Sequence, residues 1–379
     1  MGIYGLTTVL KCYNKNKNKH LSTLRDCIVD IDASNIIYKF KIKCASINNT
    51  NDSSNWELLL FNFIEKFYKY KIKLRFVFDG KPSKEKFNII QKRKVEREYA
   101  YNELNKMQCT FNNNIIYEDI SNSVEENEFY LKSINFIKMN AEVVKKQNEL
   151  IKKSQNIKYN DIERCKEILD FLRISYIHVP NMEADSVFKY LQVNNMSNYC
   201  FTNDSDSFAY GCNVINDLDY NFDTVKVYNY KEILKDFNIT DEQMKEICIC
   251  CGTDYNDSLG YKFTDLVKLF HNYGCLSNIV DDNIIPLNTI SIKFLENFDF
   301  VFDLFNQYDY PDLSSYIKNN EYLDINNEFV KNNVQLIGYN IMQFFIKYIN
   351  TIQNQKEKNK YTKKLNEYSL NHFRIKMNL

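Results

Sequence analysis

Glycine and proline are scarce in this chain of 379 residues, which contains only eight Gly and four Pro. Between Gly80 and Gly211 there is no glycine, and the only prolines of that interval are Pro82 and Pro180. These two residue types interrupt helices more strongly than any other. The interval is therefore expected to form long helices.

An excess of charge of one sign is also missing, because Lys+Arg and Asp+Glu both total 49. Net charge thus favours neither nucleic acid nor a membrane as partner. No apolar run approaches the length that spans a bilayer. The 11 cysteines are odd in number, without a regular framework or secretory signal, which indicates a reducing intracellular compartment. The chain is long enough to bury a large core, which excludes small secreted classes held by disulfides or zinc.

Short apolar runs alternate with helical patterns along the first 250 residues. Strands are expected over residues 27–31, 74–78, 174–179, 199–202 and 224–230. Helices are expected over residues 56–70, from an N-cap at Asp161 to residue 172, over 184–191, and from a cap at Thr240 or Asp241 to Gly252. This alternation predicts an α/β fold with a mostly parallel sheet flanked by helices.

Acidic side chains follow the ends of the expected strands. The set comprises Asp32, Asp79, Glu183, Asp185, Asp204, Asp206 and, after a later helix, Asp254. Because the carboxyl ends of parallel strands line one crevice, these side chains are expected to converge. Any one of them is more simply explained as a loop residue or helix N-cap. Together, however, like charges about 4 Å apart repel by about 4 kcal/mol at an effective dielectric of about 20, so either these side chains are not clustered or they hold cations.

Ligands that are all oxygen atoms select hard cations. Without converging His or Cys, the set favours Mg²⁺ or Mn²⁺ over Zn²⁺. Two such ions about 3.5–4 Å apart can activate a water and stabilise the leaving oxygen of a phosphodiester. The segment Cys248-Ile249-Cys250-Cys251 has no second Cys/His pair spaced to complete a zinc site, so buried apolar side chains are expected there.

Positive charge gathers directly after Asp79. Residues 81–99 contain seven basic and three acidic side chains, whereas residues 182–223 contain one basic and seven acidic ones. Such a run is commonly a solvated helix face, and this interpretation stays open. Lys86 and Arg93 are seven residues apart, so both can project from one helical face. A phosphate held by metal ions would then meet cations on a second side.

Six motifs in a fixed order carry a resemblance to a known family. They are Met1-Gly2-Ile3-Tyr4-Gly5-Leu6, Ile31-Asp32-Ala33-Ser34 with Tyr38, Val77-Phe78-Asp79-Gly80-Lys81-Pro82, Met182-Glu183-Ala184-Asp185, Thr202-Asn203-Asp204-Ser205-Asp206 and Gly252-Thr253-Asp254-Tyr255. Over most of residues 1–280 the chain thereby resembles the flap endonuclease and exonuclease-1 family of structure-specific 5′ nucleases, related to the xeroderma group G nuclease. Its divergence fits a virus with a large DNA genome or an AT-rich protist.

The resemblance implies a PIN-like nuclease core that cuts 5′ flaps, nicks or gaps in branched or nicked duplex DNA with a 5′ single-stranded end. The expected setting is DNA replication, repair or recombination. The seven carboxylates would hold two Mg²⁺ ions, for which Mn²⁺ substitutes, and Lys86 and Arg93 would steer the scissile phosphate. DNA contacts are implied for Gly2, Tyr38, Lys262 and Lys268. A core role for Tyr38 is an equal alternative.

The implied organisation has four parts. They are a nuclease region at 1–100, a helical arch at 101–157, a second nuclease region with a helix-two-turn-helix-like segment at 158–280, and a helical C-terminal region with a Lys-rich tail at 281–379. Lys262 stands where the family has the second Gly of its ion-binding hairpin. The tail lacks the family's sliding-clamp motif, so clamp docking is not supported. The expected location is the nucleus or, for a viral protein, a cytoplasmic replication site, without a membrane partner.

Three other functions fit parts of the sequence. Asp185 and the Asp-Ser-Asp motif favour an exonuclease-1-like 5′-to-3′ exonuclease, whereas Lys81-Pro82 favours a flap endonuclease. A catalytically inactive protein that binds DNA junctions is disfavoured because all seven carboxylates are present. The segment Asp30-Ile31-Asp32 also resembles the haloacid-dehalogenase phosphatase motif, but residues 252–257 lack the Gly-Asp-x-x-x-Asp spacing that this fold needs.

Overall fold

The computed structural model describes residues 2–12, 17–48, 53, 56–113, 142–172, 174–307, 310 and 312–318. The chain divides into two units, of which the first comprises Met1–Ile162 and Ile177–Tyr316 and the second comprises Glu163–Tyr176 and Ile317–Leu379. Every residue of the candidate site lies in the first unit. The described part of the second unit contains most of helix α6 (Tyr159–Leu172), the start of strand β4 and strand β8 (Ile317–Lys318).

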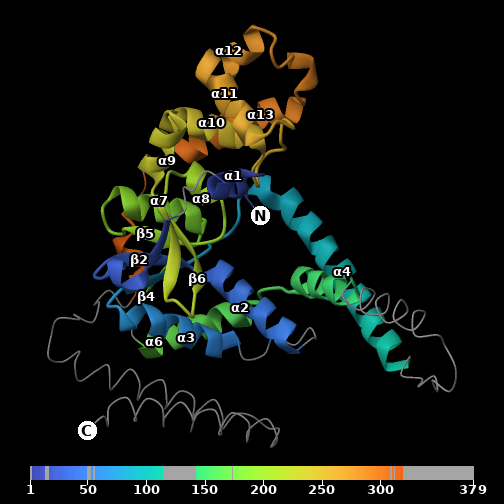
Figure 1. Cartoon of the computed structure of the whole chain (residues 1–379), viewed down its shortest axis with the longest axis vertical. Coiled ribbons are helices and arrows are strands. Elements are labelled where there is room, and N and C mark those ends of the chain that lie inside the picture. Colours follow the sequence, from blue (N-terminus) through green and yellow to red (C-terminus); the bar gives the residue numbers. More distant parts are fainter. Residues whose placement is uncertain are drawn as a thin grey trace, which may run out of the picture. The chain divides into compact units, whose positions relative to one another are not determined.

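A mostly parallel sheet forms the centre of the first unit (Figure 1). Its strands run in the order β1-β7-β6-β5-β2-β3-β4. Their bounds are Lys17–His20 (β1), Ile28–Asp32 (β2), Lys73–Phe78 (β3), Ser175–His178 (β4), Tyr199–Phe201 (β5), Val214–Asp219 (β6) and Thr224–Tyr228 (β7). Strand β2 pairs in parallel with β3 and β5, and β5 with β6, whereas β7 is antiparallel to β6 and β1. The predicted α/β fold is confirmed.

Helices follow most of these strands along the chain. Their bounds in the first unit are Leu6–Cys12 (α1), Ala33–Asn48 (α2), Trp56–Lys69 (α3), Phe87–Asn113 (α4), Ala184–Val193 (α7), Asp206–Ala209 (α8), Tyr230–Phe237 (α9), Asp241–Cys251 (α10), Phe263–Tyr273 (α11), Leu276–Asp281 (α12) and Ile292–Asn306 (α13). Residues 142–154 are also helical. Short 3₁₀ turns are Leu21–Leu24 (η1), Lys84–Lys86 (η2), Leu287–Thr289 (η3) and Ser314–Tyr316 (η4).

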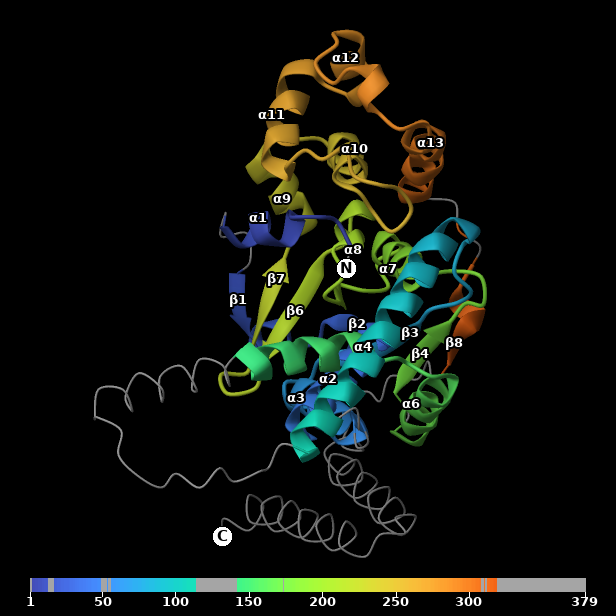
Figure 2. The same ribbon diagram turned by 90° about the vertical axis from the view of Figure 1, so that its right-hand side faces the viewer.

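The core of this unit forms where α3 packs on the sheet (Figure 2). Phe63 and Phe67 lie one helical turn apart on α3 and are buried. Their ring centroids lie 5.1 and 5.9 Å from that of Phe201 on β5, in edge-to-face contacts. The apolar stripe of α3 thus fixes the helix against the centre of the sheet.

A buried ion pair joins the two central strands. Asp30 on β2 and Arg75 on β3 are register partners, and Arg75 Nε lies 2.7 Å from Asp30 Oδ1. Burial raises the pKa of Asp30 even though Arg75 opposes that shift. Loss of one partner would leave an uncompensated buried charge, so the pair specifies the register of β2 against β3.

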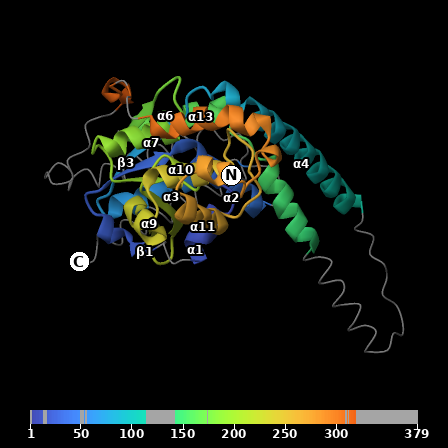
Figure 3. The same ribbon diagram turned by 90° about the horizontal axis from the view of Figure 1, so that it is seen from above.

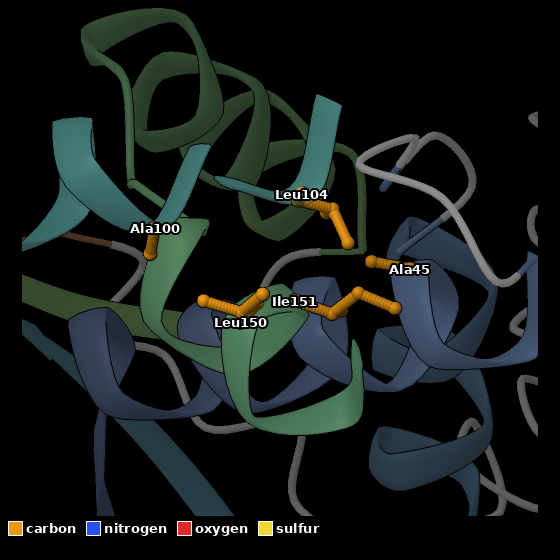
Figure 4. Packing of buried hydrophobic residues seen from close by; sticks show 5 residues of the cluster. All are labelled: Ala45, Ala100, Leu104, Leu150 and Ile151. Carbon is orange, nitrogen blue, oxygen red and sulfur yellow. The ribbon is translucent and has the colours of Figure 1, made fainter. Parts of the chain in front are cut away.

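A small apolar cluster ties the long helix α4 to its surroundings. Ala100 and Leu104 of α4, Leu150 and Ile151 of the 142–154 helix, and Ala45 of α2 pack together (Figure 4). Figure 3 shows the 142–154 helix beside α4. The long Gly-free interval therefore forms helices as predicted, although the rest of the expected arch, residues 114–141, lies outside the described residues.

Several sequence-based expectations need correction at element ends. Asp161 is not an N-cap, because α6 begins at Tyr159, and the Asp161 carboxylate instead accepts hydrogen bonds from the backbone N–H of Lys158 and from Lys41 Nζ. Strand β7 ends at Tyr228, because Asn229 caps a helix that starts at Tyr230. Thr240, rather than Asp241, caps α10 through a capping box with Gln243.

Two further expectations concern cysteines and membranes. Cys248, Cys250 and Cys251 on α10 are buried, as predicted for apolar packing. Within the described residues, no helix is long and apolar enough to cross a membrane. The Lys-rich tail, like all of residues 319–379, lies outside the described part of the chain.

Candidate metal centre and nucleic-acid interface

The ends of β2 and β5 bring Asp32 and Thr202 together. Asp32 is the last residue of β2 and is 9% exposed. Its Oδ2 accepts a hydrogen bond of 2.8 Å from the hydroxyl of Thr202, which directly follows β5. Its Oδ1 accepts one of 2.8 Å from the backbone N–H of Asn35, in the first turn of α2. The parallel pairing of the two strands places both residues at one edge of the sheet.

Asp79 and Glu183 meet at the start of α7. Asp79 directly follows β3, and its Oδ1 accepts a hydrogen bond of 3.0 Å from the backbone N–H of Ala184. This N–H is one of the donors that a helix start leaves without an intrahelical partner. Glu183 occupies the N-cap position of the same helix. Two residues on, in the first turn of α7, Asp185 accepts a hydrogen bond from the hydroxyl of Ser207.

Asp204 and Asp206 complete this edge of the sheet from the segment after β5. Asp204 Oδ1 accepts a hydrogen bond of 3.2 Å from the backbone N–H of Asp206, which begins α8 and is 2% exposed. Asp254 comes from a different direction, in the turn after α10. In that turn the backbone N–H of Thr253 donates a 3.1 Å hydrogen bond to the carbonyl of Asn256.

The acidic side chains interact electrostatically as one group. Burial, together with the charge of Asp79, raises the pKa of Asp32 to about 7. Burial and neighbouring carboxylates raise the pKa values of Asp204, and strongly those of Asp185 and Asp206. Asp254 contributes to the shifts of Asp204 and Asp206. The carboxylates that follow separate strands thus lie close enough to repel one another.

Two basic side chains neutralise part of this charge: Lys86, the last residue of η2, and Arg93, in the second turn of α4. Lys86 Nζ forms an ion pair with Glu183 Oε2 and lies 4.0 Å from Asp254 Oδ2. Arg93 Nη2 donates a hydrogen bond of 2.6 Å to Asp254 Oδ1. Lys86 and Arg93 therefore reach the same acidic cluster, although they do not share one α-helix as predicted, because Lys86 ends the 3₁₀ turn η2 directly before α4. The pKa of Lys86 is raised because these carboxylates outweigh the effect of burial.

The ligand atoms of the acidic cluster are of the kind that hard cations prefer. All seven side chains offer oxygen ligands, and Glu183 Oε1 and Asp206 Oδ1 are buried without a hydrogen-bond partner. In the described part of the chain, however, no three His, Cys, Asp or Glu side chains form a ready-made set of metal ligands. The carboxylates instead bond to Thr202, Ser207, Lys86 and Arg93.

Gly2 lies directly against this cluster. A Cβ atom at Gly2 would overlap Asp204 Oδ1 and Ser205 Oγ and would lie 2.9 Å from the backbone nitrogen of Ser205. Its φ of +87° also belongs to a region that favours glycine. The backbone near the N-terminus therefore approaches Asp204 more closely than any residue with a side chain could.

The other residues expected to contact DNA lie outside the acidic cluster. Tyr38 on α2 is half-buried, and its hydroxyl donates a hydrogen bond of 2.8 Å to the carbonyl of Lys152. Lys262 is the N-cap of α11 and Lys268 lies on that helix, and both side chains are exposed. Their roles in binding DNA stay predictions.

Three supporting residues were not predicted from the sequence. Thr202 and Ser207 hold Asp32 and Asp185, as described above. Tyr255 donates a hydrogen bond of 3.0 Å to Glu183 Oε2, and its ring centroid lies 4.6 Å from Lys86 Nζ. Hydrogen bonds between distant segments leave no local sequence pattern. The only sequence signal for these supporting roles was that Thr202 and Tyr255 belong to the motifs of the family resemblance.

Comparison with known proteins agrees with this arrangement. The model of the XPG N-terminal domain matches residues 1–100, and that of the XPG I-region matches residues 173–254. The probable RAD2-like endonuclease 369L of Invertebrate iridescent virus 6 is 27% identical over 335 residues, which cover 78% of this chain and 79% of the relative. Flap endonuclease 1 of Plasmodium falciparum is 25% identical over 307 residues, which cover 74% of this chain and 42% of that relative.

Solved structures share the fold. The catalytic core of Rad2 in complex with DNA substrate matches with a TM-score of 0.54 and 18% identity, covering 82% of this chain and 87% of that one. Flap endonuclease-1 from Methanococcus jannaschii matches with a TM-score of 0.51 and 17% identity, covering 92% and 95%. The sheet and the carboxylates at its edge define a PIN-like nuclease core. With both domain matches, the chain belongs to the XPG family of 5′ nucleases.

Proposed function

We propose that this nuclease uses Mg²⁺ to hydrolyse DNA phosphodiesters at 5′ flaps, nicks or gaps in branched or nicked duplexes. The observation that carries the proposal is that carboxylates after separate strands, and Asp254 after α10, lie close enough to raise one another's pKa values, with Lys86 and Arg93 bonded to Glu183 and Asp254. Relatives include a protein named flap endonuclease 1 and a Rad2 core bound to a DNA substrate. DNA replication, repair or recombination is the proposed setting.

The proposed cofactor is a pair of Mg²⁺ ions, for which Mn²⁺ substitutes. The residues that would hold them are Asp32, Asp79, Glu183, Asp185, Asp204, Asp206 and Asp254. Bound divalent ions in such a site act as Lewis acids that favour attack of water on the phosphodiester and stabilise the leaving oxygen. The buried, unpaired oxygens of Glu183 and Asp206 support cation binding, because an unsatisfied buried carboxylate oxygen is costly.

Lys86 and Arg93 have a proposed role that changes with the state of the cluster. Without a divalent ion they neutralise Glu183 and Asp254. With divalent ions held by these carboxylates, the ammonium of Lys86 and the guanidinium of Arg93 would be available to the non-bridging oxygens of the scissile phosphate. Positive charge fixed at that position stabilises the charge that develops during hydrolysis.

The remaining DNA contacts are assigned by position. Gly2 lies against Asp204, so we propose that it contacts the DNA strand that enters the acidic cluster. Lys262, the N-cap of α11, and Lys268, in the middle of that helix, would contact the duplex backbone, because exposed lysines suit phosphates. Tyr38, on α2, would contact a nucleobase, although its hydroxyl already donates a hydrogen bond to the carbonyl of Lys152 in the 142–154 helix. An intracellular, reducing location is proposed because the described cysteines form no disulfides.

The experiment is cleavage of an end-labelled 5′-flap duplex with Mg²⁺ or with a chelator. We expect cleavage only with Mg²⁺, and product length distinguishes removal of a whole flap from stepwise 5′-to-3′ digestion. Asp79→Ala and Asp204→Ala should abolish cleavage while binding of the flap, measured by fluorescence anisotropy, survives. Near-normal turnover in both variants would contradict the site, and full activity in the presence of chelator would contradict the metal requirement.

A further inference from the structure

Helix α13 holds Tyr255, the residue that follows Asp254, although this helix lies well beyond residue 254, where the XPG I-region match ends. Asn297 of α13 donates a hydrogen bond of 3.3 Å from its Nδ2 to the backbone carbonyl of Tyr255. Farther along the helix, the ring of Phe305 lies edge-on to that of Tyr255, with centroids 6.3 Å apart. The helix therefore contacts Tyr255 at its backbone and at its ring.

The ring of Phe305 also contacts a second tyrosine. Its centroid lies 5.0 Å from that of Tyr210, again in an edge-to-face arrangement. The hydroxyls of Tyr210 and Tyr255 are 3.4 Å apart, so the three side chains form a closed group. All three are buried, and Phe305 is 0% exposed. Because protein interiors are close-packed, the Phe305 ring restricts the positions that both tyrosine rings can take.

Tyr255 connects this aromatic group with the acidic cluster. Its hydroxyl donates a hydrogen bond of 3.0 Å to Glu183 Oε2, and its ring centroid lies 4.6 Å from Lys86 Nζ. A side chain that hydrogen-bonds a metal ligand orients that ligand, and its loss commonly costs about 10–100-fold in metal affinity or activity. The position of Tyr255 thus affects both a proposed metal ligand and the cation that pairs with it.

Two buried lysines fix the end of α13. Lys189 of α7, which is 3% exposed, donates a hydrogen bond to the backbone carbonyl of Phe305. Lys245 of α10, which is 1% exposed, donates one of 2.6 Å to Asn306 Oδ1. The last carbonyls of a helix lack intrahelical partners, and cations there interact favourably with the helix dipole. The ring of Phe305 is thereby fixed relative to α7, the helix whose N-cap is Glu183.

We propose that Phe305 is a positioning residue of the nuclease, which places Tyr255 and, through it, Glu183 and Lys86. The proposal rests on the proposed nuclease function and gives α13 a part in it. Phe305 acts through the tyrosine rings, so its role is in positioning rather than in the reaction itself. A phenylalanine that only fills the core would contribute to stability alone, and this difference decides the test.

The first variant is Phe305→Leu, which keeps an apolar side chain and removes the ring. We expect single-turnover cleavage of a 5′-flap duplex with Mg²⁺ to slow by about tenfold. Mn²⁺ affinity, measured without DNA by electron paramagnetic resonance, should fall by about tenfold as well. Flap affinity should stay within about twofold of the native value, because Tyr255 orients groups at the reacting phosphate.

Phe294→Leu is the matched control, since Phe294 lies on the same helix, is 2% exposed and packs on Phe298 with centroids 5.9 Å apart. Both substitutions remove a buried ring and should lower the thermal unfolding midpoint. The control should nevertheless keep the native cleavage rate and Mn²⁺ affinity. A control that loses both to the same extent as Phe305→Leu would show that general loosening of the core is responsible.

A double variant tests whether Phe305 acts through Tyr255. Tyr255→Ala alone should slow cleavage by about tenfold or more. Phe305→Leu added to it should slow cleavage further by less than about twofold, because residues that act through one another have non-additive effects. A further loss of about tenfold in the double variant would contradict the proposal, since Phe305 would then act by another route.

Asn297→Ala is a milder change to the same contact, because it removes one hydrogen bond to Tyr255 from a half-buried position. It should lower the cleavage rate and Mn²⁺ affinity by about threefold, as for one ordinary hydrogen bond. If Phe305→Leu does not fold, this variant decides the question. Native values of both quantities would then contradict the positioning role.

The positioning role and the nuclease function can fail separately. If the native chain binds Mn²⁺ and cuts the flap, and Phe305→Leu equals Phe294→Leu in rate and Mn²⁺ affinity, the positioning role is wrong while the nuclease function stands. If the native chain neither binds Mn²⁺ nor cuts the flap, the proposed function is wrong, and the positioning role is wrong with it.

Discussion

Lys86 contacts two carboxylates and an aromatic ring at the same time. Its ammonium pairs with Glu183, lies 4.0 Å from Asp254 Oδ2, and sits 4.6 Å from the ring centroid of Tyr255. A point charge on a flexible stem can exchange such partners for a phosphate without moving the turn η2 that carries it. Arg93, one heptad on, makes the corresponding contact to Asp254.

We therefore expect Lys86→Ala and Arg93→Ala to lower the single-turnover cleavage rate by about 100-fold each, as for a removed transition-state donor. Flap binding should change by only a few-fold, because these groups act when charge develops at the scissile phosphate. Lys92→Ala, an exposed lysine on the same helix, is the matched control. Equal losses of rate and binding would instead identify Lys86 and Arg93 as ordinary backbone contacts.

Gly2 allows a second test at the level of one residue. In Gly2→Ala the new methyl group would overlap Asp204 Oδ1, so Asp204 must shift, and we expect cleavage to slow by about 10–100-fold. Gly5→Ala separates this effect from backbone strain, since Gly5 also has positive φ but has no atom within 4 Å of a new Cβ. Similar losses of cleavage in the two variants would show that strain, rather than contact with Asp204, is responsible.

At the scale of elements, packing far from the acidic cluster determines where the basic side chains Lys86 and Arg93 lie. Ala100 and Leu104 anchor α4 against the 142–154 helix and α2, and this contact aims the first turns of α4 at the carboxylates. The sequence could predict the helix from its lack of Gly and Pro. It could not predict the anchor, because a short stripe of Ala and Leu is common on exposed helices.

A different contact between elements predicts how stability depends on pH. Asp223, in the turn between β6 and β7, accepts hydrogen bonds from Lys66, Tyr70 and Lys69 of the α3 region. Although burial raises the pKa of Asp223, these bonds lower it to about 2, below its ordinary value of 3.8. The ion pairs therefore stabilise the fold above about pH 4, and this contribution disappears as pH falls towards 2.

We expect Asp223→Asn to lower the thermal unfolding midpoint at pH 7 by several degrees. The difference from the native chain should shrink as pH falls from about 4 towards 2, where the native Asp223 also becomes neutral. Asp281→Asn, at an exposed position, should show no such difference at any pH. A constant difference between the native chain and Asp223→Asn across this range would rule out the ion pairs as its cause.

At the scale of the whole molecule, the sequence predicted the strands that end in carboxylates more reliably than their surroundings. Strand β2 is a mostly apolar run that ends in Asp32, which is a local pattern. Strands β1 and β6 were missed because Lys17–His20 and Val214–Asp219 are polar or end in acidic residues. The contact of Phe305 with Tyr255 was unpredictable, because it depends on where α13 packs after a long separation in sequence.

The distribution of charge over the whole molecule explains why a chain with zero net charge can bind DNA. Its charges are separated rather than mixed, with carboxylates at the sheet edge and cations at the start of α4. Burial and repulsion between the carboxylates raise the pKa values of Asp185, Asp204 and Asp206, and Lys86 offsets this only in part at Asp204 and Asp206. Divalent ions would remove the rest of that repulsion.

The most direct measurement is the number of divalent ions that the carboxylates bind. Mn²⁺ titration followed by electron paramagnetic resonance counts bound ions and detects magnetic coupling between neighbours. We expect two Mn²⁺ per native chain with a coupled signal, and loss of the coupled pair in Asp204→Ala. A native chain that binds no Mn²⁺, or an Asp204→Ala chain that binds the same coupled pair, would contradict a two-metal centre at this edge of the sheet.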